Sequence, residues 1–538
     1  MTGSAKFIRQ PRVRHNDYST LLVPELGEWK PRRSVSVVIP AYGSQEKLDL
    51  TLASLAGQTY PSHLLQVVVV DDGSRPPLRL PEIVPANVSL IQSQPGKWGR
   101  AHACHSGAAY AEGEVIHWLD ADMVLFRDHV EANMRWHHVA DYLVVMGYKR
   151  FVEFAAGRLR PQAVFDAVSA GSEEKLFDIE QSWRHEWVEK IIDETDGLRA
   201  SRGRTYRVHV GATASTPKAL LEAAGGMDNS LVLGEDTDLG FRLAQQGAVF
   251  VPEAAARSWH LGASTVMRRR EEVARHNEPS LSQRLPMRRD WRRWIGRQWL
   301  VPVIDVVVDA RQGPYEDVRA RVAGALAGTM PDVHVTIVGP WSDLTAARRA
   351  PLDDPMLDLR LSHEAFAHDG RVTYAERRLR TSAPAPFRLT CPPGWVPTAD
   401  ALPRLLRLIE DEGHGVVFLA LPEGADLIVA RFERTAAVAR ALAICDESDD
   451  LDDLVHEMFG SHWIDGTEWA FAPVGKPPTA ISVAALEAQA QKWKREAARW
   501  KQQADHWEAE AARLKKKLQA PVGKKLAEAA RRRLPGAR

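Results

Sequence analysis

The stretch Val115-Ile116-His117-Trp118-Leu119-Asp120-Ala121-Asp122 joins an apolar run to a pair of carboxylates. Residues 115–119 are typical of a buried strand, which predicts that Asp120 and Asp122 stand at the end of a sheet. Two carboxylates at this spacing can hold a hard divalent cation that also binds a diphosphate. Because Asp-x-Asp occurs by chance in many loops, the surrounding sequence decides whether this one is a site.

The sequence upstream of this stretch predicts a parallel sheet. Apolar runs at 35–40 and 65–70 indicate two further buried strands, and the residues between them, 45–58, place three leucines on one helical face. A second predicted helix, 101–111, precedes the strand at 115–119. Strand, helix and strand at this spacing form βαβ units, so we expect an α/β fold.

Two further acidic motifs accompany the first. Asp71-Asp72-Gly73-Ser74 ends the strand at 65–70, where open α/β sheets bind ligands, so its carboxylates could accept bonds from a base and a ribose. The alternative is a tight Asp-Gly turn. Glu235-Asp236 begins a predicted helix over 235–247. Asp236 could be a general base, or the pair could only cap the helix.

His260, in Ser258-Trp259-His260-Leu261-Gly262, is a candidate third ligand to a cation held by the two aspartates. A histidine beside a tryptophan is more often packed in a core or solvated than bound to a metal, so this alternative stays open.

Five segments together resemble family 2 glycosyltransferases of the GT-A fold, across residues 35–265, about two fifths of the chain. The segments stand in the family's order and spacing. They are SVVIPAYGSQEKLDLTLASLAGQTYP, VVVVDDGS, AEGEVIHWLDAD, AAGGMDNSLVLGEDTDLGFRLAQQG and SWHLG.

The resemblance implies a role for each matching residue in binding a nucleotide sugar. Pro40, Ala41 and Tyr42 would line the base, Asp72 would bind it with Asp71 beside it, and Asp120 would contact the ribose. Asp122 and His260 would hold Mn²⁺ or Mg²⁺ with the diphosphate, and Gly225, Gly226 and Asp228 would shape the sugar pocket. Asp236, with Glu235 beside it, would be the catalytic base of an inverting transfer.

Two departures from the family pattern bear on substrate. Ala103-Cys104-His105 stands where the family usually carries Ala-Arg-Asn, and Arg100 or Lys97 could supply the missing contact to phosphate or sugar. The QxxRW motif of processive synthases does not follow the acceptor half, so we expect a non-processive enzyme.

A second α/β pattern occupies residues 301–474. Strands are predicted at 303–308, 333–338, 416–421 and 427–432, with a helix at 318–326. The order and spacing of these elements match those of the first domain, but Gly339-Pro340-Trp341-Ser342 replaces Asp-Asp-Gly-Ser. We predict a degenerate second copy of the GT-A fold; the alternative is an unrelated small α/β domain.

The remaining segments are predicted to connect or to associate. Residues 1–34 form an arm, 172–194 an amphipathic helix, and 266–300 a connecting, surface-lying helical segment rich in Arg and Trp. Heptads of Trp and Leu against Ala predict a coiled coil over 480–520, with the seam at 483–518 making a homo-oligomer. The basic tail, 521–538, could contact anionic lipid. Packing on the chain itself, and solvated disorder of the tail, are the alternatives.

Composition narrows the function classes. The 70 basic and 70 acidic residues cancel, so we expect no nucleic-acid partner. Three distant cysteines form no disulfide framework, which favours a cytoplasmic protein. The N-terminal residues do not resemble a signal peptide, and no apolar run approaches the roughly 20 residues that cross a bilayer. Any membrane contact would be peripheral, at the inner face of the cell membrane.

Together these features predict an inverting, metal-assisted glycosyltransferase. It would move a sugar from a nucleoside-diphosphate sugar, UDP-sugar above all, to a hydroxyl of a glycan or of a lipid-linked precursor of cell-wall polysaccharide. One alternative is a catalytically weak pseudo-transferase scaffold acting through its coiled coil. A nucleotidyltransferase is a third candidate, but it would need a Gly-rich, basic phosphate loop just after the first strand, and no Lys or Arg precedes Lys47 there.

Overall fold

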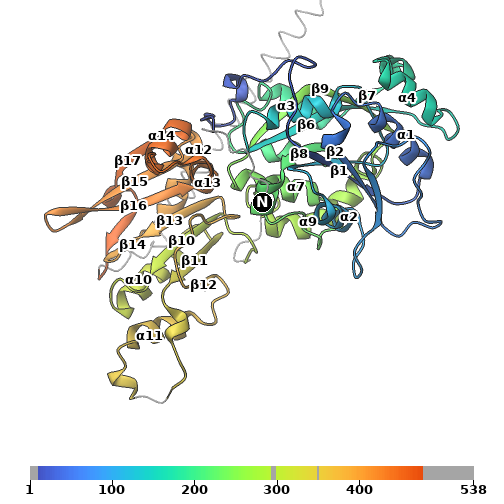
Figure 1. Ribbon diagram of the computed structural model, residues 1–538. Helices are drawn as coiled ribbons and strands as arrows, with labels where there is room; N and C mark the ends of the chain where they lie inside the picture. Colours follow the sequence, from blue (N-terminus) through green and yellow to red (C-terminus); the bar gives the residue numbers. More distant parts are fainter. Residues whose placement is uncertain (1–9, 293–297, 348–349, 476–538) are drawn as a thin grey trace, which may run out of the picture. The chain divides into compact units, whose positions relative to one another are not determined.

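The computed structural model describes residues 10–292, 298–347 and 350–475, of which 10–474 form one compact unit (Figure 1). This unit contains two sheets, one in each α/β domain. Among the described residues, no helix has the length and apolar character that crossing a membrane requires. The predicted coiled coil and basic tail lie outside the described residues.

The first domain is built on a nine-stranded mixed sheet with the order β3-β2-β1-β4-β8-β6-β9-β5, and β7 pairs with β6. Its strands are β1 Val35–Ala41, β2 Leu65–Asp71, β3 Val88–Gln92, β4 Val115–Leu119, β5 Met123–Leu125, β6 Leu143–Val152, β7 Trp183–Arg184, β8 Thr213–Pro217 and β9 Val249–Leu261. Its helices are α1 Gln45–Ala56, α2 Arg100–Tyr110, α3 His129–His137, α4 Pro161–Ser169, α5 Glu186–Glu194, α6 Lys218–Ala223, α7 Glu235–Gln245, α8 Thr265–Arg268 and α9 Arg270–Arg284.

The centre of this sheet is buried on both faces, which explains why its strands are continuous apolar runs. In β1 and β4, Val37 and Val115 lie in one core and Val38 and Ile116 in the other. Both strands run parallel to each other, and β1 also runs parallel to β2. Their carboxyl ends therefore meet at one edge, which places the acidic motifs together.

The second domain carries a seven-stranded sheet with the order β12-β11-β10-β13-β16-β15-β17, and β14 pairs with β18. Its strands are β10 Ile304–Asp309, β11 Val333–Val338, β12 Val372–Ala375, β13 Phe387–Cys391, β14 Trp395–Pro397, β15 Val416–Glu423, β16 Asp426–Arg434, β17 Ser461–Asp465 and β18 Phe471–Pro473. Its helices are α10 Tyr315–Leu326, α11 Leu357–Phe366, α12 Ala401–Glu412, α13 Thr435–Ile444, α14 Leu451–Phe459 and α15 Gly466–Trp469.

The two sheets have the same topology over seven strands. In the first, β3, β2, β1 and β4 are parallel, β8 is antiparallel to both β4 and β6, and β9 is parallel to β6. In the second, β12, β11, β10 and β13 are parallel, β16 is antiparallel to both β13 and β15, and β17 is parallel to β15. Matching order and direction are what a second copy of one fold would show.

Residues 172–194 do not form the single amphipathic helix that the sequence predicts. Only α5 is α-helical there; before it come two 3₁₀ turns and the short strand β7. The Asp178 side chain accepts the Glu180 amide, a local bond that competes with helix formation. Phe177 is buried against Trp259, so packing overrides the helical pattern.

The segment 266–300 is helical in part, over α8 and α9, and most of the residues of these two helices are exposed, but other residues of the segment are buried. Leu281, Leu285 and Trp299 are buried. The N-terminal arm is also partly buried: Val13 lies in a core shared by both domains, and Asn16 bonds with the backbone of Phe250. Both segments therefore belong to the folded unit.

Candidate active site

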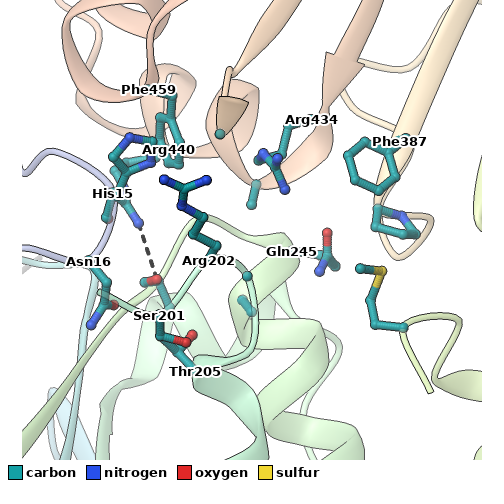
Figure 2. Close-up of a pocket in the computed structure, with 17 residues that line it drawn as sticks. His15, Asn16, Ser201, Arg202, Thr205, Gln245, Phe387, Arg434, Arg440 and Phe459 are labelled. Carbon is teal, nitrogen blue, oxygen red and sulfur yellow. Dashed lines mark hydrogen bonds between the residues drawn. The ribbon is translucent and has the colours of Figure 1, made fainter. Parts of the chain in front are cut away.

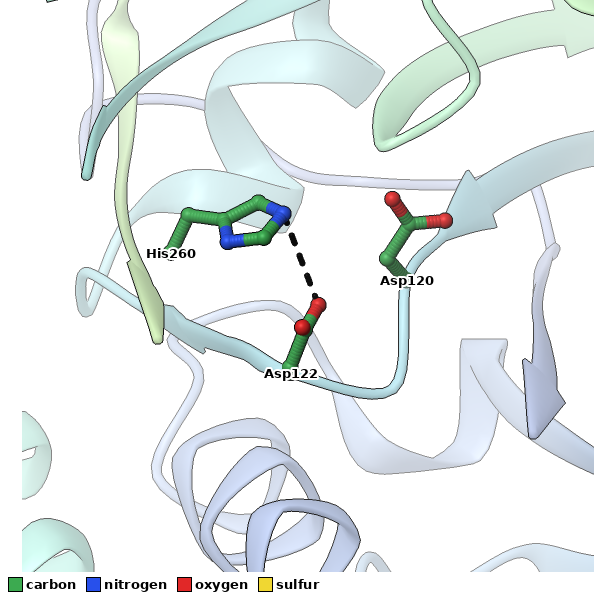
Figure 3. A group of neighbouring side chains, drawn as sticks. All are labelled: Asp120, Asp122 and His260. Carbon is green, nitrogen blue, oxygen red and sulfur yellow. Dashed lines mark ion pairs between the residues drawn. The ribbon is translucent and has the colours of Figure 1, made fainter. Parts of the chain in front are cut away.

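Asp120, Asp122 and His260 form one cluster at the carboxyl edge of the first sheet (Figure 3). The two aspartates lie on the turn between β4 and β5. Because β5 pairs with β9, placing Met123 opposite His260, the turn is brought against the end of β9. One ligand atom from each of the three residues lies within 4.8 Å of the others, and His260 Nε2 is 3.6 Å from Asp122 Oδ1.

The cluster fits a divalent cation. Carboxylate oxygens suit Mg²⁺ and Mn²⁺, and an imidazole binds a metal only in its neutral form. Burial lowers the pKa of His260, although Asp122 and Asp120 act against that effect, so the ring is held neutral. Each aspartate side chain is about a quarter exposed, which leaves the carboxylates accessible. Asp120, Asp122 and His260 would hold the ion.

Lys47 also contacts this cluster. Its Nζ lies 3.2 Å from Asp122 Oδ2 and donates to the carbonyl of Leu261. An ammonium beside one oxygen of Asp122 can also contact an anionic ligand at the same carboxylate. Lys47 was not predicted to be a site residue, because it lies on α1, far from Asp122 in the sequence.

Arg100 links the Asp-x-Asp motif to the start of α7. Its Nε and Nη2 donate to Asp120 Oδ1 at 3.0 and 2.9 Å, and its Nη1 donates to Glu235 Oε1 at 2.8 Å. Nη2 also donates to the carbonyl of Gly211 at 2.7 Å. The sequence predicted that Arg100 contacts the donor; here its side chain spans two acidic motifs that lie 115 positions apart.

Asp120 and Glu235 share Arg100 as a partner, but their pKa values are shifted in opposite directions. Burial alone would raise the pKa of Asp120, but the Arg100 guanidinium holds it below its ordinary value. Burial raises the pKa of Glu235 in spite of the same partner. Asp120 is therefore a stable anion, whereas Glu235 is closer to protonation.

Asp236 lies in the first turn of α7, and one of its carboxylate oxygens accepts no short hydrogen bond from the described residues. Its Oδ1 accepts the Thr237 amide at 2.7 Å, whereas within the described part of the chain Oδ2 has only the Gly211 amide near it, at 3.5 Å. His209 Nδ1 donates to the Asp236 carbonyl at 2.7 Å and fixes the backbone. Oδ2 is thus available to accept a proton, as a general base requires.

The Asp71-Asp72 pair divides into two roles. Asp71 is fully buried, and its carboxylate accepts the amides of Ser74 and Leu78 and the Gln92 side chain, so it holds the turn. Asp72 Oδ2 accepts the Gly99 amide at 2.6 Å. Asp72 Oδ1 is buried and has no hydrogen-bond partner among the described residues, so it can accept a bond from a ligand.

The other predicted site residues lie around this edge. Pro40 and Ala41 end β1, and the Ala41 carbonyl accepts the Asp72 amide, while the Tyr42 side chain is 75% exposed. Gly225 and Gly226 take positive φ, which L side chains rarely adopt.

Asp228 is held by its own chain. Its carboxylate accepts from Ser230 and, at 3.1 Å, from Arg284 Nε. Lys97, the alternative phosphate contact, donates to Asn229 at 2.7 Å. These bonds stabilise the loop before α7.

Lys149 is a site residue that the sequence analysis missed. It lies on β6 opposite Ser258, is 7% exposed, and no hydrogen bond from its ammonium occurs within the described residues. Burial lowers its pKa to about 8, and its charge interacts with those of Asp120 and Asp236. The signal available in the sequence was a single lysine in an otherwise buried strand.

The second domain lacks this chemistry at the matching position. Between β13 and β14, where the first domain has Asp120-Ala121-Asp122, the chain reads Pro392-Pro393-Gly394. These residues have no side-chain oxygen to bind a cation.

The model of the family "Glycosyl transferase family 2" matches residues 36–198. This segment runs from β1 past both predicted nucleotide motifs and the Asp-x-Asp turn. The chain contains a family 2 glycosyltransferase domain. It is built on the mixed α/β sheet described above and is followed by the second α/β domain.

Relatives match different shares of the chain. The chain is 24% identical to chondroitin synthase from Escherichia coli over 367 residues, 64% of this chain and 50% of that protein. It is 27% identical to the pre-mycofactocin glycosyltransferase of Mycobacterium tuberculosis (strain CDC 1551 / Oshkosh) over 231 residues, 43% of each. The chain thus spans about half the length of these relatives.

Among solved structures, the mannosyltransferase PcManGT from Pyrobaculum calidifontis, in complex with GDP-Man and Mn²⁺, is similar at 18% identity with a TM-score of 0.31. The match covers 47% of this chain and 62% of that one.

Proposed function

We propose that the chain transfers a sugar, with inversion, from a nucleoside-diphosphate sugar to a hydroxyl of a glycan or lipid-linked polysaccharide precursor. UDP-sugar is the donor that we favour. One observation carries the proposal: at the carboxyl edge of one sheet, Arg100 links a cation-type cluster to Glu235, the residue directly before the predicted base Asp236. The relatives reported above are named a chondroitin synthase and a pre-mycofactocin glycosyltransferase, and these names are consistent with the proposal.

The donor would lie between the two acidic turns. Asp72 Oδ1, buried and without a partner among the described residues, would accept a bond from the base. Pro40, Ala41 and Tyr42 would flank the base, and Asp120 would face the ribose. Lys149 and Lys47 lie near the predicted diphosphate position and would offset its charge.

The acceptor would be activated by Asp236. Its Oδ2 would take the proton from the attacking hydroxyl while Thr237 holds Oδ1. A divalent ion held by Asp122, His260 and Asp120 would supply charge neutralisation at the departing diphosphate. Arg100 would keep Asp120 ionised and Glu235 in place, so that both halves of the site stay aligned.

The test is Mn²⁺-dependent hydrolysis and transfer with a panel of nucleotide sugars. We expect one donor to be consumed, and we expect Asp122→Ala and Asp236→Asn to lower transfer at least about a hundredfold with an unchanged melting temperature. Asp166→Asn, which changes an exposed carboxylate on α4, is the matched control. Near-normal transfer by Asp236→Asn would refute its role as the base.

The second domain we infer to be a degenerate copy of the GT-A fold, supported by the shared strand order and by Pro392-Pro393-Gly394 in place of the Asp-x-Asp turn. A scaffold without catalysis is the alternative, and hydrolysis of any nucleotide sugar with a metal would exclude it. For the predicted coiled coil and tail, sizing of the chain with and without 480–538 tests oligomer formation. Sedimentation with anionic vesicles tests peripheral membrane contact.

A further inference from the structure

The two domains together line a cleft of about 980 Å³. Seven arginines line it against four carboxylates. We call it the arginine cleft and define it by Arg202, Arg204 and Arg207 of the first domain and by Arg407 and Arg434 of the second. An excess of arginines in a concave surface favours an anionic ligand, because Arg presents several donors in one plane to carboxylate or phosphate.

Three of the four carboxylates are already paired. Asp290 pairs with Arg288 at 2.8 Å and Glu410 with Arg289 at 2.7 Å. Glu194 lies 3.7 Å from Lys190. These pairs cancel their own charges, so Asp411 is the one lining carboxylate left to offset the other arginines of the cleft.

Arg202, Arg204, Arg207 and Arg434 have no carboxylate partner of this kind within the described residues. Among the described residues, no carboxylate lies within ion-pair distance of Arg204 or Arg207. Arg202 donates to the backbone carbonyl of Asp411, and Arg434 donates to the carbonyls of Ile409 and His414. Carbonyl oxygens satisfy donors but do not neutralise the positive charges.

A smaller cavity of about 80 Å³ adjoins the cleft and shares Arg202 and Arg434 with it. Figure 2 shows the Arg202 side chain directed toward the elements that carry Arg434 and Arg440. The buried Ser201 hydroxyl, which lines both spaces, has no hydrogen-bond partner among the described residues. The positive charges that converge here repel one another. A bound anion would offset this repulsion, and a hydroxyl group on that anion could form a hydrogen bond with Ser201.

The cleft is continuous in sequence with the predicted active site. Arg207 precedes His209 by two residues, and His209 and Gly211 hold the backbone and carboxylate of Asp236. Chain geometry limits the Cα distance from Arg204 to Gly211 to about 25 Å. An oligosaccharide can span that length from the cleft to the base.

We propose that the arginine cleft binds the anionic groups of an oligosaccharide acceptor. The second domain would thereby supply one wall of the acceptor site. That this oligosaccharide is the acceptor rests on the proposed function, whereas binding of an anionic glycan in the cleft does not.

Nucleic acid is the other polyanion that such a cleft could hold. The whole chain argues against it, because 70 basic and 70 acidic residues give no net positive charge. Tyr206, the aromatic residue lining the cleft, is 1% exposed and cannot stack on a base.

The test is fluorescence anisotropy on the full chain without donor. The probes are a labelled hexasaccharide with alternating uronic acids, a glycerol-phosphate hexamer, a neutral hexasaccharide and a single-stranded oligonucleotide. We expect at least one anionic glycan probe to bind about tenfold more tightly than the neutral one, and more weakly as salt rises. Which of the two binds tells carboxylate from phosphate.

Two double variants complete the test. Arg204→Ala/Arg207→Ala should weaken binding about tenfold, whereas Arg160→Ala/Arg319→Ala, with the same charge change at exposed positions outside the cleft, should not. Arg204→Lys/Arg207→Lys should restore part of the affinity. Equal affinities for both alanine variants, equal binding of the neutral probe, or tighter binding of the oligonucleotide would overturn the proposal. If the wild-type chain binds the glycan but hydrolyses no nucleotide sugar, the proposed function fails and the cleft stands.

Discussion

Replacing Arg100 by methionine tests whether the two acidic motifs form one unit. Methionine keeps much of the side chain's length and removes its charge. The change breaks four bonds: two to Asp120, at 3.0 and 2.9 Å, one to Glu235 at 2.8 Å and one to the Gly211 carbonyl at 2.7 Å. Asp120 and Glu235 then lose the guanidinium that they share.

The magnitude follows from burial. Removing one member of a buried ion pair costs about 3–5 kcal/mol, because a desolvated charge stays behind. The Arg100 and Asp120 side chains are each about a quarter exposed, whereas Glu235 is 5% exposed, so we take the lower end, about 3 kcal/mol. For a domain of this size that corresponds to a melting temperature lowered by about 6–12 °C.

The pH dependence has a definite sign. In the wild type, Arg100 holds the pKa of Asp120 below its ordinary value, so this contribution to stability is present above that ordinary value and is lost as pH falls through the folded value. In Arg100→Met the carboxylates are penalised while ionised, and protonation removes the penalty. The gap between variant and wild type therefore narrows as pH falls from 7 toward 4.

Differential scanning fluorimetry at several pH values measures this gap. Arg257→Met is the control, because Arg257 pairs with Glu174 at the surface, with both side chains more than half exposed, and should change the melting temperature by less than about 2 °C. A shift for Arg100→Met as small as that of the control, or a large shift that does not depend on pH, would refute the assignment of Arg100 as the link.

Three further changes test neighbouring parts of the structure. Lys149→Met should weaken nucleoside-diphosphate binding about tenfold by calorimetry without lowering the melting temperature, because it removes a buried charge whose pKa is lowered to about 8; unchanged binding, or a lowered melting temperature, would contradict this. Burial lowers the pKa of His129 to about 4, so stability should fall as pH drops from about 6.5 to 4, and less steeply in His129→Gln; parallel curves would remove His129 from the cause. Arg440→Met should lower the melting temperature by several degrees, since its guanidinium donates from the second domain to carbonyls of the first domain and of the arm; an unchanged scan would show that these bonds are not needed.

Buried strands were the part of the fold that the sequence predicted best. Residues 35–40, 65–70 and 115–119 match β1, β2 and β4 to within a residue, because strands buried on both faces are apolar throughout and end where polar residues begin. The acidic motifs could be found for the same reason, since two of them stand where a strand ends and the third stands where a helix begins. Residues 172–194 show the opposite case, in which an amphipathic pattern was overridden by the packing of Phe177.

The network around the acidic motifs could not be predicted in the same way. Arg100 meets Glu235, and Lys149 meets the charges of Asp120 and Asp236, only because β4, β6 and α7 converge in space. Local spacing carries no information on such contacts. The local sequence signal for Lys149 was a charged residue inside a mostly buried strand.

The attachment of the second domain bears directly on the predicted base. Arg440, on α13, donates to the carbonyls of Gly247 and Ala248, which directly follow α7. It also donates to Val13 and His15 of the arm. Because α7 begins at Glu235 and Asp236, the helix is held at one end by Arg100 and at the other by Arg440. A domain without the Asp-x-Asp turn can therefore still affect the predicted site, because it fixes the helix that carries Asp236.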